Sequence, residues 1–276
     1  IDFDAFEDAF GNSISCFGGT DGELTATISG GTPSYTWLWT YPDNSTSSDE
    51  LIQDLSEGIY SLNINDINSC IGFDSVFVSQ PDSLSISLMS PDSNGYNVTC
   101  FNGNDGSIIT TVNGGTPPFL FQWVYPDGGI GSTDQNPGYL QAGTYILLLT
   151  DAYSCTATDT ITLVSSDAIT FTTIISDYNG YAVPCAGDSL ADVEIIPNGG
   201  TPPYIVVWDN GDTSFTQSGL NAGQYEGLIY DSQNCIGQFS VDITEPPSLL
   251  VDFTISAFSS GFQLQCNGDS SAYIYT

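Results

Sequence analysis

The 276-residue sequence contains no lysine, arginine or histidine, although it carries 33 aspartates and glutamates and a formal net charge of −33 at pH 7. Charged residues make up only 12% of the chain, against about 25% in an average protein. The unusual feature is therefore the loss of every cation and not an excess of acid. A chain without cations cannot neutralise phosphates, which excludes nucleic-acid binding and disfavours anionic membrane surfaces.

The sequence also lacks an apolar run of about 18 residues, the length that a membrane-spanning helix needs. No signal peptide precedes Ile1. We therefore expect a segment without a membrane span, taken from the inside of a longer protein.

Residue types that usually carry catalysis are missing as well. General acid–base catalysis and catalytic triads usually depend on histidine, and lysine nucleophiles and arginine clamps are absent too. No glycine-rich phosphate loop, zinc pattern or EF-hand loop occurs. Two carboxylates can hydrolyse glycosides, but no unique pair stands out, so we expect no enzyme.

What the chain does contain is an internal repeat, which begins at Cys16, Cys100 and Cys185 and starts a fourth time at Cys266. Each full copy has a Gly-Gly-Thr-Pro turn, a tryptophan 23 residues after its first cysteine, a Leu-x-x-Gly-x-Tyr motif and a second cysteine 10 residues after that tyrosine. The tryptophans are Trp39, Trp123 and Trp208, the tyrosines are Tyr60, Tyr145 and Tyr225, and the second cysteines are Cys70, Cys155 and Cys235.

Within each copy, apolar residues alternate with polar ones at period two, as in Leu24, Ala26 and Ile28, and no helical pattern occurs. Short alternating strands between Gly, Pro, Asn and Asp turns predict an all-β fold, a tandem array of small Ig-like β-sandwiches with about seven strands each. The Leu-x-x-Gly-x-Tyr motif resembles the tyrosine corner of such domains, although the cysteine spacing departs from that of true immunoglobulin domains.

The junctions between copies predict four segments. Residues 1–80, 81–165 and 166–246 form repeats 1, 2 and 3, and residues 247–276 start a truncated repeat 4. The junctions are only a few residues long, and two contain proline, so we expect semi-rigid links.

We predict one disulfide within each repeat, because every repeat keeps both cysteine positions and a domain of about 80 residues gains from a cross-link. The predicted pairs are Cys16–Cys70, Cys100–Cys155 and Cys185–Cys235, with Cys266 unpaired by truncation. Each bond is worth roughly 4 kcal/mol in the chain-entropy model and implies an oxidising, extracellular compartment. The alternative is that these cysteines are free buried thiols.

The repeat as a whole resembles the SprB repeat of Bacteroidota surface adhesins. The features that carry the resemblance are the Cys-x-Gly-x-x-Asp-Gly start, the Gly-Gly-Thr-Pro turn, the tryptophan, the Leu-x-x-Gly-x-Tyr motif and the Asp-x-x-x-Cys end. The resemblance implies a long cell-surface protein exported by type IX secretion, with tandem repeats forming a filament used in gliding motility or attachment. Repeat 3 departs from the pattern, because Leu190-Ala191 replaces Asp21-Gly22 and Asp105-Gly106. Proteins of these bacteria are also glycosylated at Asp-Ser/Thr before an apolar residue, which makes the chain a candidate glycoprotein with O-glycosylation candidates at Ser75, Ser83, Thr160 and Ser189.

Calcium is the one cofactor for which the residues make a case. Asp66, Asp151 and Asp231 recur six residues after the motif tyrosine, and calcium prefers oxygen ligands. The alternative for these aspartates is an Asx turn that closes the hairpin before the second cysteine.

We therefore expect a structural and adhesive repeat segment of an exported cell-surface filament, secreted and without enzymatic activity. Its expected partners are neighbouring repeats of the same chain, with glycans or surfaces as candidates. The alternative is an accessory array of carbohydrate-binding modules on a secreted enzyme that degrades polysaccharides.

Overall fold

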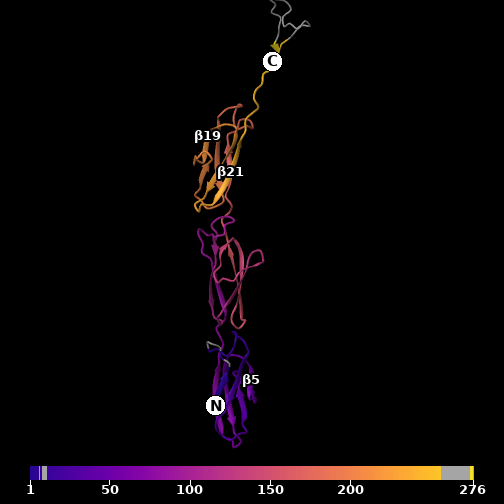
Figure 1. Cartoon of the computed structure of the whole chain (residues 1–276), viewed down its shortest axis with the longest axis vertical. Helices are drawn as coiled ribbons and strands as arrows, with labels where there is room; N and C mark the ends of the chain where they lie inside the picture. The colour runs from indigo at the N-terminus through magenta and orange to yellow at the C-terminus, as the bar shows by residue number, and fades with distance from the viewer. Residues whose placement is uncertain (6, 8–10, 256–273, 276) are drawn as a thin grey trace, which may run out of the picture. The chain divides into compact units, whose positions relative to one another are not determined.

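The structure is a computed structural model that describes residues 1–5, 7, 11–255 and 274–275. The described residues form 23 β-strands and no helix, which confirms the all-β prediction. Backbone contacts divide the chain into two compact units, Ile1–Ser166 and Asp167–Thr276, here called unit 1 and unit 2 (Figure 1). No helix able to cross a membrane occurs in the part of the chain that the structure describes.

The first sandwich of unit 1 has seven strands in two antiparallel sheets, ordered β1-β2-β5 and β4-β3-β6-β7. If the strands are named A, B, C, C′, E, F and G in chain order, these sheets are A-B-E and C′-C-F-G, the Ig-like arrangement that the sequence predicts. The strands are β1 (Asp2–Ala5), β2 (Gly22–Thr27), β3 (Thr36–Thr40), β4 (Thr46–Ser47), β5 (Leu51–Leu55), β6 (Gly58–Asn65) and β7 (Ile71–Val78).

The second sandwich of unit 1 follows the same plan, with a four-stranded sheet ordered β12-β11-β14-β15. Its other layer consists of the pairs β10-β8 and β13-β9, because the B strand is interrupted at Ile108. The strands are β8 (Ser85–Met89), β9 (Gly106–Ser107), β10 (Ile109–Asn113), β11 (Leu120–Val124), β12 (Ile130–Ser132), β13 (Gly138–Leu140), β14 (Gly143–Thr150) and β15 (Thr156–Leu163).

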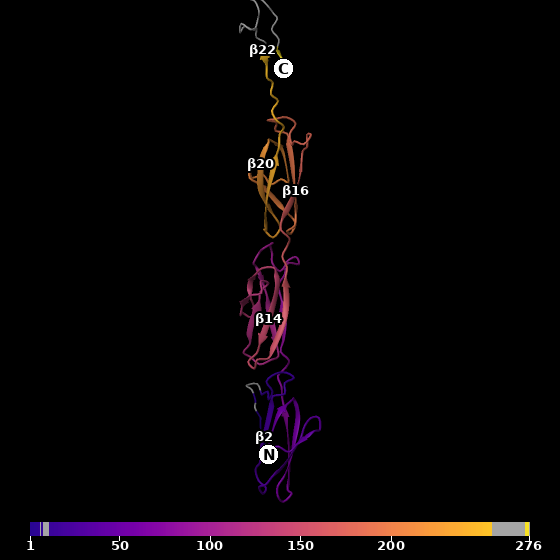
Figure 2. The ribbon, with the colours of Figure 1, turned by 90° about the vertical axis from the view of Figure 1, so that its right-hand side faces the viewer.

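Unit 2 contains a third sandwich without a C′ strand, built from the sheets β16-β17-β19 and β18-β20-β21. Figure 2 labels β16 and β20, one from each of its layers. The strands are β16 (Thr170–Ile175), β17 (Ala191–Asn198), β18 (Ile205–Trp208), β19 (Thr216–Leu220), β20 (Gly223–Tyr230) and β21 (Ile236–Ile243). A separate short pair, β22 (Thr254–Ile255) and β23 (Ile274–Tyr275), lies later in the chain.

Each sandwich has its own hydrophobic core, and a motif tryptophan lies in each one. Trp39 and Trp123 are fully buried and Trp208 is 2% exposed. Each indole N–H donates to a backbone carbonyl, those of Asp49, Asp134 and Ser214, at 3.0, 2.9 and 2.8 Å. The repeated tryptophan thus fills the space between two layers while its one polar group stays satisfied.

The tyrosine corner predicted from Leu-x-x-Gly-x-Tyr is confirmed in all three sandwiches. The hydroxyl groups of Tyr60, Tyr145 and Tyr225 donate to backbone carbonyls four residues upstream, at 3.0, 2.9 and 3.2 Å. The motif glycine has a positive φ in all three sandwiches, a conformation that favours glycine. In the first two, a Cβ would also clash with a proline: at Gly143, with φ +150°, it would lie 2.5 Å from Pro126 Cγ. The motif therefore fixes how the chain enters strand F.

Candidate functional site

The first cysteine of each repeat lies in a tight turn, which we call the first-cysteine loop (residues 13–19, 97–103 and 182–188). The carbonyl of each first cysteine accepts the backbone N–H of the residue three positions later. Gly19 N donates to Cys16 O at 2.9 Å, Gly103 N to Cys100 O at 2.8 Å and Asp188 N to Cys185 O at 3.1 Å. In repeat 2, Asp105 accepts hydrogen bonds from the backbone N–H and the hydroxyl of Thr99. The aspartate of Cys-x-Gly-x-x-Asp-Gly therefore shapes the loop that carries the cysteine.

The first-cysteine loop is attached to the end of the last strand of its own repeat. Ile14 N donates to Ser79 O and Val98 N to Val164 O, each at 3.0 Å. In unit 2, Ala182 N donates to Thr244 O at 3.0 Å. The first cysteine therefore lies at the end of the sandwich from which the chain leaves toward the next repeat.

The second cysteine of each repeat closes the hairpin between strands F and G, which we call the second-cysteine hairpin (residues 66–70, 151–155 and 231–235). In repeat 2, the Asp151 carboxylate accepts backbone N–H bonds from Tyr153, Cys155 and Thr116 at 2.9, 2.9 and 3.0 Å. Thr116 belongs to the Gly-Gly-Thr-Pro turn, so one buried carboxylate joins that turn to the hairpin. Asp66 and Asp231 make the equivalent bonds in repeats 1 and 3.

These hydrogen bonds also set the electrostatics of the hairpin. The backbone N–H groups of Cys70 and Thr32 donate to Asp66 and lower the pKa of its carboxyl below the ordinary value. No group of three Cys, Asp or Glu side chains that could hold a metal ion occurs among the described residues. The Asx-turn geometry accounts for Asp66, Asp151 and Asp231, whose role as calcium ligands stays a prediction.

The two cysteines of one repeat lie at opposite ends of its sandwich. Strand β14, eight residues long, connects the tyrosine corner at one end to the second-cysteine hairpin at the other, and eight residues of strand span roughly 26 Å. A disulfide needs Cα atoms within about 7 Å. The two cysteines of a repeat are therefore too far apart to bond.

The predicted pairs within repeats, Cys16–Cys70, Cys100–Cys155 and Cys185–Cys235, are accordingly wrong. Cys155 bonds to Cys16, across 139 residues of sequence and from one sandwich of unit 1 to the other. Cys70 and Cys185 are free and exposed thiols, which excludes Cys16–Cys70 and Cys185–Cys235. Cys100 and Cys235 are disulfide-bonded, and Cys266 lies outside the described residues.

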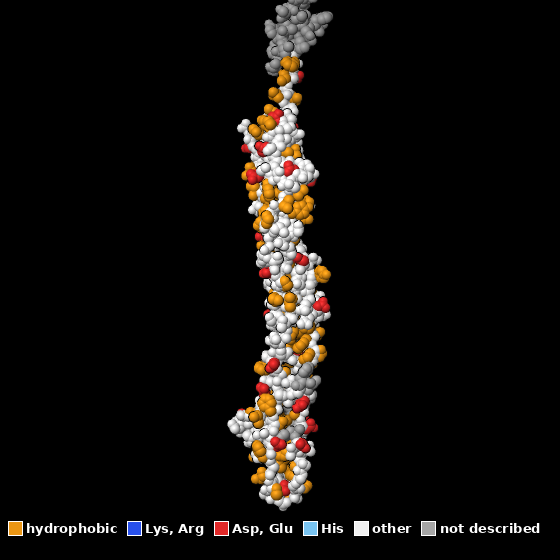
Figure 3. Space-filling model, turned by 90° about the vertical axis from the view of Figure 1, so that its left-hand side faces the viewer, with side chains coloured by type: hydrophobic (Ala, Val, Ile, Leu, Met, Phe, Trp, Pro, Cys, Tyr) orange, Lys and Arg blue, Asp and Glu red, His pale blue; other side chains and the backbone are white. Residues whose placement is uncertain are grey.

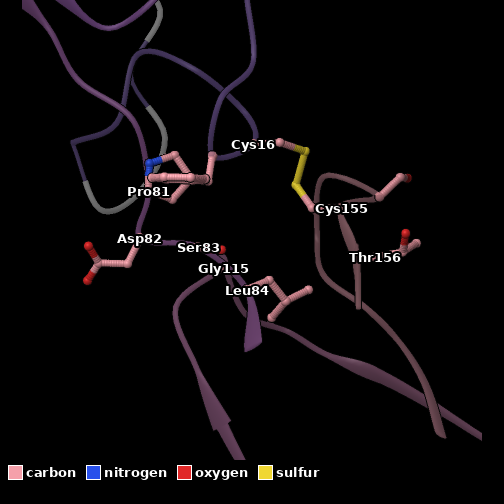
Figure 4. A pocket seen from close by; sticks show the side chains of 10 residues that line it. Cys16, Pro81, Asp82, Ser83, Leu84, Gly115, Cys155 and Thr156 are labelled. Carbon is pink, nitrogen blue, oxygen red and sulfur yellow. A yellow bond between two sulfur atoms is a disulfide. The ribbon is translucent and has the colours of Figure 1, made fainter. Parts of the chain in front are cut away.

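The Cys16–Cys155 bond lies beside the linker between the two sandwiches of unit 1. Figure 4 shows the two sulfur atoms joined, with Pro81, Asp82 and Leu84 of the linker lining the same cavity. Pro81 is buried, Gly18 N donates to Gln80 Oε1 at 2.6 Å and Gly115 N donates to Asp82 O at 2.9 Å. Both sandwiches therefore hold the linker through hydrogen bonds, and the disulfide closes the junction covalently.

The sequence contained a signal that could have revealed this connection. A cysteine between strands A and B and a cysteine between strands F and G fall at opposite ends of any Ig-like sandwich, because each strand reverses the direction of the chain. The first cysteine of one repeat and the second cysteine of the next, such as Cys16 and Cys155, can then meet across the junction between the repeats. Repeat equivalence alone, on which the predicted pairs rest, does not count the strands between the cysteines.

The four predicted glycosylation residues, Ser75, Ser83, Thr160 and Ser189, are all exposed. Two of them lie on the last strand of a sandwich, where the preceding aspartate accepts their backbone N–H at 2.8 Å. Their modification stays a prediction. The face in Figure 3 carries scattered carboxylates and no cationic side chain, as the composition requires.

Solved structures with a similar trace include the three N-terminal domains of the highly immunogenic outer capsid protein of bacteriophage RB49. That match has 12% identity and a TM-score of 0.42, and covers 82% of this chain and 90% of that one. The eight N-terminal Ig domains of Down syndrome cell adhesion molecule match at 11% identity and a TM-score of 0.33, covering 81% of this chain and 34% of theirs. A fragment of intimin in complex with the intimin-binding domain of its receptor matches at 15% identity and a TM-score of 0.32, covering 55% and 59%.

No curated protein matches this chain. The family model described as the SprB repeat matches residues 12–44 and 96–128, which contain the first-cysteine loop, the Gly-Gly-Thr-Pro turn and the buried tryptophan of repeats 1 and 2. Repeat 3, in which Leu190-Ala191 replaces the Asp-Gly pair, lies outside the matched residues. The chain therefore carries SprB-type repeats.

Proposed function

We propose that this chain is a structural and adhesive segment of an exported cell-surface filament, in which Ig-like repeats form a stalk used in surface attachment or gliding. One observation carries the proposal: the Cys16–Cys155 disulfide joins consecutive SprB-type sandwiches instead of stapling each one. A bond across a junction adds nothing inside either core, but it holds neighbouring repeats together when the chain is pulled.

The proposed filament divides into the repeats predicted from the sequence, with boundaries after residues 80, 165 and 246. In support, the three hydrophobic cores draw on residues 1–78, 84–163 and 169–243. An extracellular location fits the disulfides, which persist in oxidising compartments. Export by type IX secretion, a Bacteroidota source and a non-enzymatic role belong to the same proposal.

The test is antibody labelling of intact source cells, followed by deletion of the segment from its gene. We expect antibodies raised against the chain to label cells that have not been permeabilised, and their Fab fragments to reduce attachment to glass or gliding speed. Labelling that requires permeabilisation contradicts surface exposure. A deletion strain that attaches and glides like its parent contradicts the adhesive role.

Carbohydrate binding is a second candidate, supported by an exposed apolar surface on repeat 1. Phe73 and Phe77 on β7 are 64% and 56% exposed, and Ile59 lies opposite Phe77 on β6 with 61% exposure. Exposed rings present flat apolar faces of the kind that stack on sugars. Binding of a polysaccharide that is lost in Phe73→Ala and retained in Leu120→Ala, an exposed apolar residue of repeat 2, favours this candidate.

A further inference from the structure

Two exposed thiols occupy positions whose equivalents in other repeats are disulfide-bonded. Cys185 is the first cysteine of repeat 3, and the first cysteines of repeats 1 and 2 are both oxidised. Cys70 is the second cysteine of repeat 1, and the second cysteines of repeats 2 and 3 are both oxidised. Each free thiol therefore has a bonded counterpart in the same chain.

The surroundings of Cys70 reproduce those of the bonded Cys155. Cys70 N donates to Asp66 Oδ1 at 2.8 Å, as Cys155 N does to Asp151 Oδ1 at 2.9 Å. Asp66 N donates to Cys70 O at 3.0 Å, which matches Asp151 N and Cys155 O, also at 3.0 Å. The second-cysteine hairpin thus has its bonding conformation in repeat 1 while its thiol is free.

The same holds for Cys185 and the bonded Cys16. Their carbonyls accept the N–H groups of Asp188 and Gly19 at 3.1 and 2.9 Å, and both loops are attached to the end of the last strand of their repeat. A glutamine or glutamate at the exit of that strand holds the loop in both repeats: Gly18 N donates to Gln80 Oε1 at 2.6 Å and Gly187 N to Glu245 Oε2 at 2.8 Å.

We propose that Cys70 and Cys185 are covalent attachment sites for further SprB-type repeats. Cys70 bonds to the first cysteine of a repeat placed before repeat 1, and Cys185 bonds to the second cysteine of a repeat placed after repeat 3. Each repeat offers one cysteine at each end, and a disulfide of the Cys16–Cys155 type then connects repeat 1 to the repeat before it and repeat 3 to the repeat after it. The proposal concerns connectivity and does not depend on the adhesive role.

Space for the incoming loop is present next to Cys70. The disulfide-bonded Cys155 of repeat 2 lines a cavity that is also lined by Cys16 and Phe17 of repeat 1 and by Gly115 of the Gly-Gly-Thr-Pro turn. Beside Cys70 lies a cavity of about 210 Å³ lined by Gly31, the equivalent of Gly115, together with Tyr35 and Asp66. A first-cysteine loop can therefore approach Cys70 from the side on which Cys16 approaches Cys155.

The bond forms by thiol–disulfide exchange with a low-molecular-weight disulfide such as oxidised glutathione. The thiolate of one cysteine displaces one glutathione thiolate and forms a mixed disulfide. The thiolate of the complementary cysteine attacks the protein sulfur of that mixed disulfide and releases the second glutathione. Two cysteine thiols thus lose two protons and two electrons, and one oxidised glutathione becomes two reduced ones.

The test adds one repeat to the intact array and maps the disulfides by mass spectrometry in a glutathione redox buffer. In the first chain, a copy of residues 82–165 follows Pro246 in place of residues 247–276, because Pro81 and Pro246 occupy equivalent positions. We expect Cys185 to bond to the copied Cys155, with at least a tenfold fall in the fraction of Cys185 that reacts with a thiol label. Changing the copied Cys155 to serine should restore that reactivity.

A second chain carries a copy of residues 85–169 before Ile1, where Cys70 should bond to the copied Cys100. Hydrogen exchange reports whether each added repeat is folded, and the Cys16–Cys155 bond serves as the internal standard. The proposal is overturned if a folded added repeat leaves Cys70 or Cys185 reduced, or if its two copied cysteines bond to each other. If one added repeat does not fold, the other chain decides the matter.

Discussion

Asp151 is a buried carboxylate in a chain that has no cationic side chain to pair with it. Its charge is balanced instead by three backbone N–H donors, which connect the second-cysteine hairpin to the Gly-Gly-Thr-Pro turn. Backbone dipoles here take the place of an ion pair. The recurrence of this aspartate in every repeat therefore has a structural cause that does not require a metal ion.

Replacing this carboxylate should open the end of the sandwich. Asp151→Ala leaves three N–H donors without their acceptor, and an unsatisfied buried donor costs about 1–3 kcal/mol, so we expect a loss of about 3 kcal/mol in the free energy of unfolding of repeat 2. Hydrogen exchange of residues 143–163 measures this loss. Asp92→Ala, at an exposed position, is the matched control, and equal protection in both variants contradicts the assigned role.

Acid should remove the hydrogen bonds of another aspartate, Asp105. The Thr99 hydroxyl and backbone N–H lower the pKa of its carboxyl. A group with a lowered pKa in the folded state stabilises the fold above its unfolded pKa of about 3.9, and this stabilisation is lost as the pH falls through the folded value. Asp105→Asn should therefore be less stable than the parent at pH 6, by less than about 1 kcal/mol because the site is exposed, and the difference should shrink as the pH falls through the lowered pKa of Asp105.

Urea unfolding of both proteins over this pH range measures the difference. Asp82→Asn, an exposed linker residue, controls for the removal of one negative charge from a chain of high net charge. A difference in the free energy of unfolding between Asp105→Asn and the parent that does not change with pH would show that the charge of Asp105 plays no part.

At the scale of the element, the period-two pattern and the repeated motifs predicted the sandwiches, their tyrosine corners and their buried tryptophans. Those features depend on contacts between neighbouring strands or within one motif, and such contacts produce a recognisable pattern of residues over a short stretch of sequence. No motif predicted the interruption of the B strand at Ile108 or the loss of the C′ strand in unit 2. Both depend on details of packing between strands.

The tyrosine corner can be tested through its single hydroxyl. Tyr145→Phe keeps the ring in the core and removes the donor to Gln141 O, which should cost about 1 kcal/mol. Differential scanning calorimetry measures the loss as a lower unfolding temperature. Tyr139→Phe removes a hydroxyl from a side chain that is 89% exposed and should leave the unfolding temperature unchanged. If it lowers that temperature as much as Tyr145→Phe does, the hydrogen bond of the tyrosine corner does not stabilise the fold.

At the scale of the whole molecule, the disulfide connectivity was the feature that sequence reasoning missed. A cysteine pair is fixed by the distance between two loops, and that distance depends on how many strands separate them and on which repeats adjoin. The matched spacing of Cys16 and Cys70 with Cys100 and Cys155 indicated equivalence, and equivalence allows pairing within repeats and pairing between them. Only the three-dimensional course of the strands separates the two.

Pairing between repeats changes how the molecule responds to force. In the chain-entropy model, closing the 139-residue loop between Cys16 and Cys155 destabilises the unfolded chain by roughly 5 kcal/mol. The bond also transmits applied force directly from Cys16 to Cys155, so the residues between them are not stretched. A chain pulled at Ile1 and Val164 through handles that do not use thiols should therefore extend less when oxidised. At about 3.4 Å per residue, the shortfall relative to Cys16→Ser/Cys155→Ser should be about 470 Å. Single-molecule extension measures this length directly, and equal final lengths of the oxidised parent and the double variant would mean that this disulfide does not form.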